Sequence, residues 1–230
     1  MVYFAEKNWI TSSQAAHELG LSKSRVLALR ESGDLIATSV GGRSLLFDAA
    51  SVWSFKQYAR KSARPYSPRI AMATLYLLSG QSAPWINRQE QYRLHKRLET
   101  VDAPTLVWQT RRRAQLHEYW VRDAFLEQVA SELRISAASG ELAENFELVP
   151  TSVIEGYASV EQAKLLVERL RMKEGASPAK VRLRTAAYWP EGEGPMPVAV
   201  RAVDLAESLN PRERRAGEQR LVDLLAGYKN

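Results

Sequence analysis

Two short helical segments, separated by one glycine-containing turn, constrain the start of this chain more than any other feature. Thr11 is followed at capping-box spacing by a glutamine, which predicts a helix that begins near Ser12 and ends at Gly20. Ser22 is a suitable N-cap for a second helix over residues 23–32. Two short helices joined by a tight turn form a helix-turn-helix.

Two β-prone runs follow the second helix, on either side of Gly41-Gly42. A Gly-Gly pair in this position predicts a two-residue hairpin turn, and Arg43 comes directly after it. Residues 49–60 predict a third helix with four apolar anchors: Val52, Trp53, Phe55 and Tyr58. A helix-turn-helix followed by a hairpin and a helix is a winged helix-turn-helix, with the hairpin as its wing.

The excess positive charge of the chain is concentrated in this first part. The formal net charge is +6; residues 1–69 contain ten Lys and Arg against five Asp and Glu, whereas residues 70–230 contain 22 against 21. A basic patch confined to one module is typical of a domain that binds a polyanion. A basic surface without a partner is the alternative that charge alone leaves open.

The segment ITSSQAAHELGLSKSRVLALRESGDLIATSVGGRSLLFDAASVWSF resembles the winged helix-turn-helix of the excisionase and MerR families. The resemblance implies that residues 1–62 bind double-stranded DNA, with the second helix in the major groove. The candidate DNA-binding residues are Thr11, Ser12, Ser22, Lys23, Ser24, Arg25, Arg30, Arg43, Arg60, Lys61 and Arg64. A helix-turn-helix that contacts protein instead of DNA is the alternative.

A basic, proline-containing segment marks the expected end of the first domain. Pro65 and Pro68 discourage helix, so we expect residues 63–69 to be a linker between a domain at 1–62 and one at 70–230. The second domain is expected to have helices at 70–78, 87–98, 120–133 and 160–173, strands at 105–110, 146–149, 153–157 and 181–189, an apolar segment at 197–205, and a last helix from Asn210-Pro211. The predicted fold class is α+β: an N-terminal winged helix-turn-helix, then a mixed helical and α/β domain.

Two arginine-containing motifs of the second domain are expected to face solvent. Arg111, Arg112 and Arg113 are consecutive and cannot share one helix face, so at least one should reach solvent, a nucleic acid or an acidic partner. A solvated charge run is the favoured interpretation. Arg182 and Arg184 alternate with apolar residues, which predicts a strand with one wet, basic face.

A second resemblance covers most of the chain. The strings SPRIAMATLYLLSG, ISAASG, LVPTSVIEGYAS, VRLRTAAYW and VRAVDLAESLNPRERRAG follow the winged helix in that order. Together they resemble actinobacterial transcriptional regulators of the AbiEi-like type IV antitoxin group. The resemblance implies a repressor of its own operon, whose residues 70–230 counteract a nucleotidyltransferase-like toxin and/or form a homodimer. No individual residue can be assigned to that second role.

Two other functions stay open beside the antitoxin. An excisionase-like architectural protein of a mobile element would use the same N-terminal domain to bend DNA. A protein-interaction module would use it to contact another protein. The neighbouring gene separates the first two functions, because an antitoxin stands beside a nucleotidyltransferase-like toxin and an excisionase beside an integrase.

The sequence contains no motif for catalysis, a cofactor or a metal ion. It has no cysteine, and its histidines, His17, His95 and His117, have no second ligand at metal-site spacing. Nucleophile-elbow and dinucleotide-binding glycine motifs are absent as well. We therefore expect a protein that is not an enzyme. The lack of cysteine, of an apolar leader and of any run of ~18 apolar residues leads us to expect a cytoplasmic protein without a membrane segment.

Overall fold

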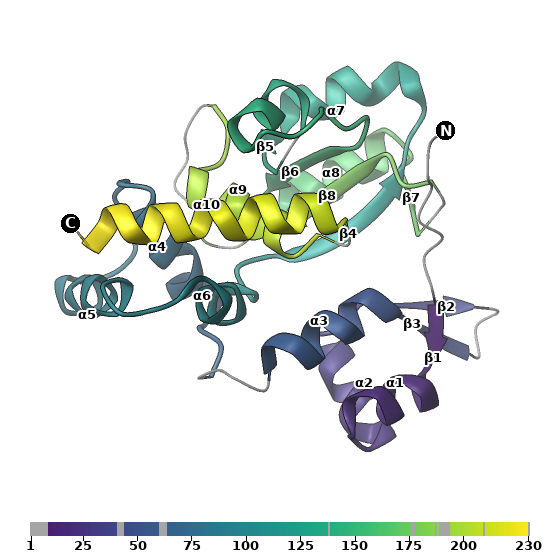
Figure 1. The fold of residues 1–230 in the computed structure, drawn as a ribbon. Helices are drawn as coiled ribbons and strands as arrows, with labels where there is room; N and C mark the ends of the chain where they lie inside the picture. Colours follow the sequence, from purple (N-terminus) through teal and green to yellow (C-terminus); the bar gives the residue numbers. More distant parts are fainter. Residues whose placement is uncertain are drawn as a thin grey trace. The chain divides into compact units, whose positions relative to one another are not determined.

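The computed structural model divides the chain into two compact units, Met1–Ser62 and Ala63–Asn230, here called unit 1 and unit 2. It describes residues 9–40, 44–59, 64–137, 139–175, 178–186, 188, 194–208 and 210–229. The fold is mixed α+β, with many helices and two small sheets (Figure 1). None of the helices in these ranges is long and apolar enough to cross a membrane.

Unit 1 combines three helices with a three-stranded antiparallel sheet. In chain order its elements are β1 (Trp9–Thr11), α1 (Ser12–Leu19), α2 (Lys23–Glu31), β2 (Ala37–Val40), β3 (Ser44–Asp48) and α3 (Ala49–Ala59). β3 is the central strand and pairs with both β1 and β2. The unit has a core of its own, formed by Ala15, Ala16, Val26, Leu29, Leu35, Phe47 and Val52.

Local hydrogen bonds set the limits of α1 and α2. The Thr11 hydroxyl accepts the Gln14 N–H at 3.3 Å, and the Gln14 side chain accepts the Thr11 N–H at 2.8 Å. Gly20 ends α1 with a φ of 65°, a left-handed conformation that glycine adopts at little cost. The Ser22 hydroxyl then accepts the Arg25 N–H at 3.3 Å and begins α2. The predicted starts of both helices are confirmed.

One predicted anchor of the third helix is wrong. Val52 is buried and Phe55 packs against the core, but Trp53 is 53% exposed. The side chain of Tyr58 lies outside the described residues. Residues 41–43, where the tip of the wing is predicted, lie outside the described residues as well.

Unit 2 is built around a five-stranded sheet. Its elements are α4 (Pro68–Leu78), α5 (Arg88–Leu98), α6 (Ala103–Thr110), β4 (Gln115–Trp120), η1 (Asp123–Phe125), α7 (Leu126–Glu132), β5 (Arg134–Ile135), η2 (Gly140–Phe146), β6 (Ile154–Ala158), α8 (Val160–Arg169), β7 (Lys173–Glu174), β8 (Val181–Thr185), α9 (Val198–Ala206) and α10 (Pro211–Lys229). The strand order is β5-β6-β8-β4-β7; β6 and β8 are parallel and the other pairs antiparallel.

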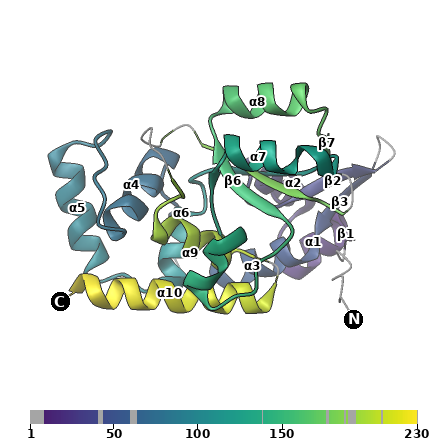
Figure 2. The same cartoon turned by 90° about the horizontal axis from the view of Figure 1, so that it is seen from above.

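The sheet of unit 2 separates two different layers. Figure 2 shows α7 and α8 on one side of β6, and α9 and α10 on the other. Side chains from α7 and α8 form an apolar core with Val181 and Leu183 of β8. A second apolar core joins α4, α5, α6, α9 and α10. Because side chains alternate along β8, Arg182 and Arg184 point to the face opposite Val181 and Leu183.

Several element predictions for unit 2 are wrong. The predicted strand at 105–110 is helix α6: the Asp102 carboxylate accepts the Thr105 N–H at 2.9 Å, and Pro104 lies in the first turn. These N-terminal helix signals outweigh a β-prone composition. Pro68 does not break a helix but begins α4, so the predicted linker at 63–69 ends earlier.

Three further predicted elements have different bounds. The predicted helix at 120–133 is the end of β4, a 3-10 turn and the short α7. The predicted strand at 146–149 is the end of η2 and a loop. The helix predicted over 160–173 ends at Arg169, before β7. Two of these ends are local turns: Glu147, after η2, has a φ of 54°, and Arg171, after α8, has a φ of 49°.

Candidate functional sites: the start of α2 and a buried charge cluster

The first turn of α2 presents polar and cationic side chains on the surface of unit 1. Val26 and Leu29 are buried in the core, and they fix the rotation of the helix about its axis. The residues that this rotation leaves exposed include Ser22, Lys23, Ser24, Arg25 and Arg30. The free N–H groups and positive dipole end of a helix N-terminus also favour an anion.

The three cations of α2 are available to a ligand. Within the described part of unit 1, no carboxylate forms an ion pair with Lys23, Arg25 or Arg30. Lys56 on α3, by comparison, pairs with Glu18 on α1 at 3.1 Å. Among the described residues of unit 1, the cations without an ion pair are thus gathered on α2.

The other candidate DNA-binding residues are placed differently. Thr11 is exposed, but its hydroxyl is used in the capping box, and Ser12 is half-buried. Arg64 is exposed and belongs to unit 2. Arg43, Arg60 and Lys61 lie outside the described residues. The structure therefore brings together Ser22, Lys23, Ser24, Arg25 and Arg30 on one helix.

A cluster of charged side chains is buried between the sheet of unit 2 and α9. Arg113, which follows α6, is fully buried and donates to Glu207 at 2.7 and 3.0 Å and to Asp204 at 3.2 Å. Asp204 also accepts the Tyr157 hydroxyl at 2.8 Å and the Ser136 hydroxyl. The charge of Arg113 is therefore neutralised by carboxylates from α9 and the residue that follows it.

The second part of the cluster lies on neighbouring strands. Arg184 of β8 donates to Glu155 of β6 at 2.8 Å, and its Nε lies 3.2 Å from Asp204. Burial raises the pKa of Glu155, and the Arg184 guanidinium opposes this shift. Burial also raises the pKa of Tyr157 well above its ordinary value, with Asp204 adding to the shift. Tyr157 is thus held in its neutral form, as a donor to Asp204.

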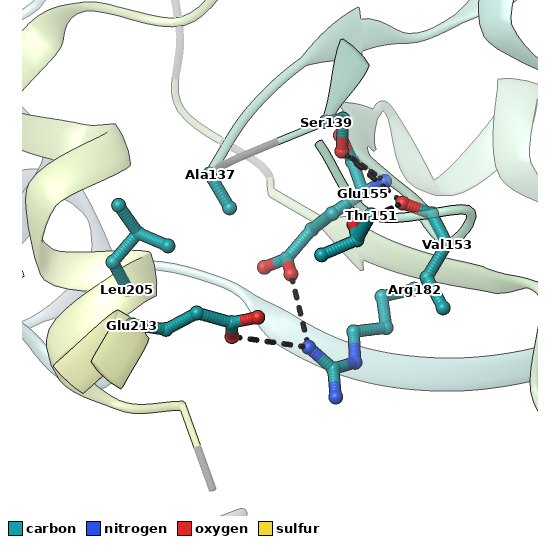
Figure 3. Close-up of a pocket in the computed structure, with 8 residues that line it drawn as sticks. All are labelled: Ala137, Ser139, Thr151, Val153, Glu155, Arg182, Leu205 and Glu213. Carbon is teal, nitrogen blue, oxygen red and sulfur yellow. Dashed lines mark hydrogen bonds and ion pairs between the residues drawn. The ribbon is translucent and has the colours of Figure 1, made fainter. Parts of the chain in front are cut away.

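Figure 3 shows a small cavity beside this cluster. It is lined by Ala137, Ser139, Thr151, Val153, Glu155, Arg182, Leu205 and Glu213. Arg182 extends between two carboxylates there, 3.6 Å from Glu155 and 4.0 Å from Glu213. The cavity measures about 10 Å³, which is room for one water molecule. These ion pairs connect the sheet of unit 2 to α9 and α10.

Two solvent-exposure predictions are therefore wrong. Arg113 is not part of a solvated run but is fully buried; Arg111 stacks on Trp108, 3.5 Å from the ring centre. Arg184 on β8 is nearly buried rather than on a wet face. The carboxylates that permit this come from β6 and the α9 region, 20 to 94 residues away in the chain. One signal was present: Asp204 interrupts the apolar sequence of α9, and an acidic residue there needs a partner.

Models of known protein families, curated protein sequences and solved structures give no match to the chain. Across the described ranges, no group of three or more His, Asp and Glu side chains is placed to hold a metal ion.

Proposed function

We propose that this protein is a sequence-specific regulator of transcription that binds double-stranded DNA through unit 1. The observation that carries the proposal is the first turn of α2, where Val26 and Leu29 anchor the helix. Lys23 and Arg25 are exposed there and form no ion pair with another described residue. In a helix-turn-helix, residues at this end of the second helix contact base edges and phosphates.

Two further features of unit 1 support this proposal. Gly20 makes the turn between α1 and α2 tight enough for the two helices to pack through one small core. The antiparallel pair β2–β3 follows α2 in the chain, which is the order that we propose for a wing after a helix-turn-helix. In this proposal α2 is the recognition helix, and Arg43, which precedes β3 in the sequence, contacts a phosphate.

The first test measures binding of the full chain to DNA from its own upstream region. Arg25→Ala removes a proposed base contact, so we expect a loss of about 1–3 kcal/mol of binding free energy and a relaxed sequence preference. Arg93→Ala is the matched control, because Arg93 is exposed on α5 and the change in net charge is the same. An unchanged footprint for Arg25→Ala, or equal losses for both variants, would contradict the assignment of α2.

The second test addresses the wing. Arg43→Ala should weaken binding to all DNA sequences about equally. It should also lower the slope of log affinity against log salt concentration by roughly 0.9, the value for one phosphate contact. A changed sequence preference with an unchanged slope would instead make Arg43 a base-reading residue.

The resemblance to type IV antitoxins extends the proposal to unit 2. We propose that unit 2 counteracts a nucleotidyltransferase-like toxin in the cytoplasm and/or joins two chains into a dimer. The family-like string at 203–217 spans the end of α9 and the start of α10, and supplies Asp204, Glu207 and Glu213 to the charge cluster. These residues support the fold of unit 2, so the toxin-binding surface lies elsewhere on it.

Co-expression in growing cells tests the role of unit 2. The full chain should restore growth to cells that express the neighbouring gene product, and residues 63–230 should do so without unit 1. Rescue by unit 1 alone would reverse this division of roles. If the neighbouring gene product does not inhibit growth by itself, the antitoxin proposal is wrong. DNA bending by the full chain, measured on permuted fragments, would favour the excisionase-like alternative.

A further inference from the structure

The outer face of α2 carries side chains of three different chemistries. Ser24, Leu27 and Glu31 follow one another at intervals of three and four residues, so they lie on one stripe of the helix, here called the outer stripe. All three are exposed. Val26 and Leu29 are buried in the core, and the outer stripe lies on the side of α2 away from them. A partner that approaches α2 from solvent therefore meets this stripe first.

Leu27 places an apolar side chain in the middle of the outer stripe. It is 37% exposed, and Lys23 and Arg30 neighbour it on the helix surface, four residues before and three residues after it. Neither cation forms an ion pair with a carboxylate of the described residues. The two cations attract the phosphates of a duplex, whereas Leu27 can contact a base edge only through apolar atoms.

Glu31 places a carboxylate at the C-terminal end of the same stripe. No described residue forms an ion pair with it, and the residues three and four positions before it are Ala28 and Leu27. A negative charge at this end of a helix opposes the helix dipole, and it also repels phosphates. On a surface that meets DNA, such a carboxylate is favourable only against a base edge that donates a hydrogen bond.

We propose that the outer stripe of α2 reads two pyrimidines in the major groove: Leu27 contacts the methyl group of a thymine, and Glu31 accepts a hydrogen bond from the amino group of a cytosine. The inference rests on the DNA binding proposed for unit 1 and names the bases that it recognises. Ser24 is assigned no base, because its hydroxyl lies 3.0 Å from the hydroxyl of Ser22, the N-cap of α2.

The chemistry of the base edges decides the two assignments. Thymine alone presents a methyl group in the major groove, so it alone offers an apolar contact to Leu27. Cytosine presents an amino donor there, whereas adenine places an acceptor beside its amino group and guanine presents only acceptors, which a carboxylate avoids. Four residues of a helix rise about 6 Å, so the thymine and the cytosine should lie within about two base pairs of each other.

Replacement of thymine by deoxyuridine tests Leu27, because the two bases differ only in the methyl group. The full chain first selects its preferred site from a pool of random duplexes, and each thymine of that site is then replaced in turn. Loss of the methyl contact should weaken binding about fourfold at one position. Leu27→Ala should weaken binding to the thymine site and should remove its sensitivity to this replacement. Leu165→Ala, a matched change of an exposed leucine on α8, should keep that sensitivity.

Single base-pair substitutions in the same site test Glu31. Glu31→Gln should reduce the preference for cytosine at one position by about tenfold. The same variant should bind DNA of unrelated sequence more tightly, because a charge that repels phosphates is removed. Glu168→Gln, a matched change of an exposed carboxylate in the last turn of α8, should alter neither property.

A wild-type chain that selects no site from the pool would overturn sequence-specific binding by unit 1, and the roles of Leu27 and Glu31 with it. A selected site without a methyl-sensitive thymine, or a Leu27→Ala chain that stays sensitive, would overturn the role of Leu27 while the DNA binding stands. A Glu31→Gln chain with an unchanged cytosine preference would overturn the role of Glu31 in the same way.

Discussion

Among single residues, Arg113 shows most clearly how unit 2 keeps charge in its interior. The side chain is fully buried, yet Asp204, Glu207 and Tyr157 accept its N–H groups. Burial alone would lower the pKa of Arg113, but the nearby Glu207, Tyr157 and Asp204 raise it well above its ordinary value. Arg113 therefore stays charged, and the stability of unit 2 depends on these partners.

Removal of Arg113 should strongly destabilise unit 2. Arg113→Leu leaves the carboxylates of Asp204 and Glu207 without their main partner, so the free energy of unfolding should fall by about 3–5 kcal/mol. Denaturant unfolding at pH 7 measures the change. Arg93→Leu is the control, since Arg93 is exposed on α5 and its loss should change stability by no more than about 0.5 kcal/mol. Equal effects for the two variants would mean that the buried cluster contributes little.

Among the elements, α9 and α10 approach each other closely at Gly217. A Cβ atom added to Gly217 of α10 would lie 2.4 Å from the Ala202 carbonyl oxygen and 2.4 Å from the Ala206 nitrogen. These are backbone atoms of α9, which cannot move aside without separating the two helices. Glycine at this position therefore sets the distance between α9 and α10, and with it the position of Asp204.

A methyl group at position 217 should force the two helices apart. Gly217→Ala should lower the free energy of unfolding by about 1–3 kcal/mol, as overpacking does. Gly227→Ala, on the same helix, meets no atom within 4 Å and should instead be neutral or stabilise the chain by up to about 1 kcal/mol, because alanine favours helix. Calorimetric melting of both variants measures the contrast. Two variants of similar stability would rule out a tight contact at Gly217.

The cap of α6 gives a pH-dependent prediction. Hydrogen bonds from the Thr105 side chain and backbone hold the pKa of Asp102 below its usual 3.8. The carboxylate therefore contributes stability that is present above pH 3.8 and is lost as the pH falls through the folded-state pKa. Asp102→Ala should cost about 1 kcal/mol at pH 7. That difference from wild type should shrink below pH 3.8.

Asp102→Asn is the matched control for this titration. Asparagine caps helices about as well as aspartate but does not titrate, so the variant should be close to wild type at pH 7. Wild type should lose stability relative to it on acidification. Urea unfolding at pH 7, 4 and 3 tests both variants. A wild-type advantage over Asp102→Ala that is the same at all three values would show that the carboxylate charge does not contribute to the cap.

For the whole molecule, the two units carry separate cores. Unit 1 has one around Phe47, whereas unit 2 has two, on either side of its sheet. Residues 1–62 should therefore fold alone and bind DNA, and residues 63–230 should fold alone and not retard DNA. Circular dichroism melting and gel retardation of the two fragments measure this. Binding of DNA by residues 63–230, or an unfolded fragment 1–62, would contradict the division.

Affinity of the isolated first unit for DNA should be lower than that of the full chain if unit 2 joins two chains. A dimer places two copies of α2 on one DNA face, and the second contact gains from a high effective concentration. Equilibrium sedimentation of the fragments and the full chain identifies the part that dimerises. A monomeric full chain whose affinity equals that of residues 1–62 would exclude this role for unit 2.

The sequence by itself determined those elements whose ends are set by neighbouring residues. Thr11, Gly20 and Ser22 fix the limits of α1 and α2 through contacts within four residues, and Asn210 caps α10 in the same way, accepting the Arg212 N–H at 2.9 Å. Such contacts follow from side-chain type and spacing alone. The helix α6 was open to prediction too, because Asp102 and Pro104 are helix-start signals beside a β-prone run.

Only the tertiary structure decided which charged residues are buried and which partners they have. Nothing near Arg113 or Arg184 in the chain shows that they are buried, since their partners Asp204, Glu207 and Glu155 lie 20 to 94 residues away. A charge can enter a protein interior only where folding brings an opposite charge to it.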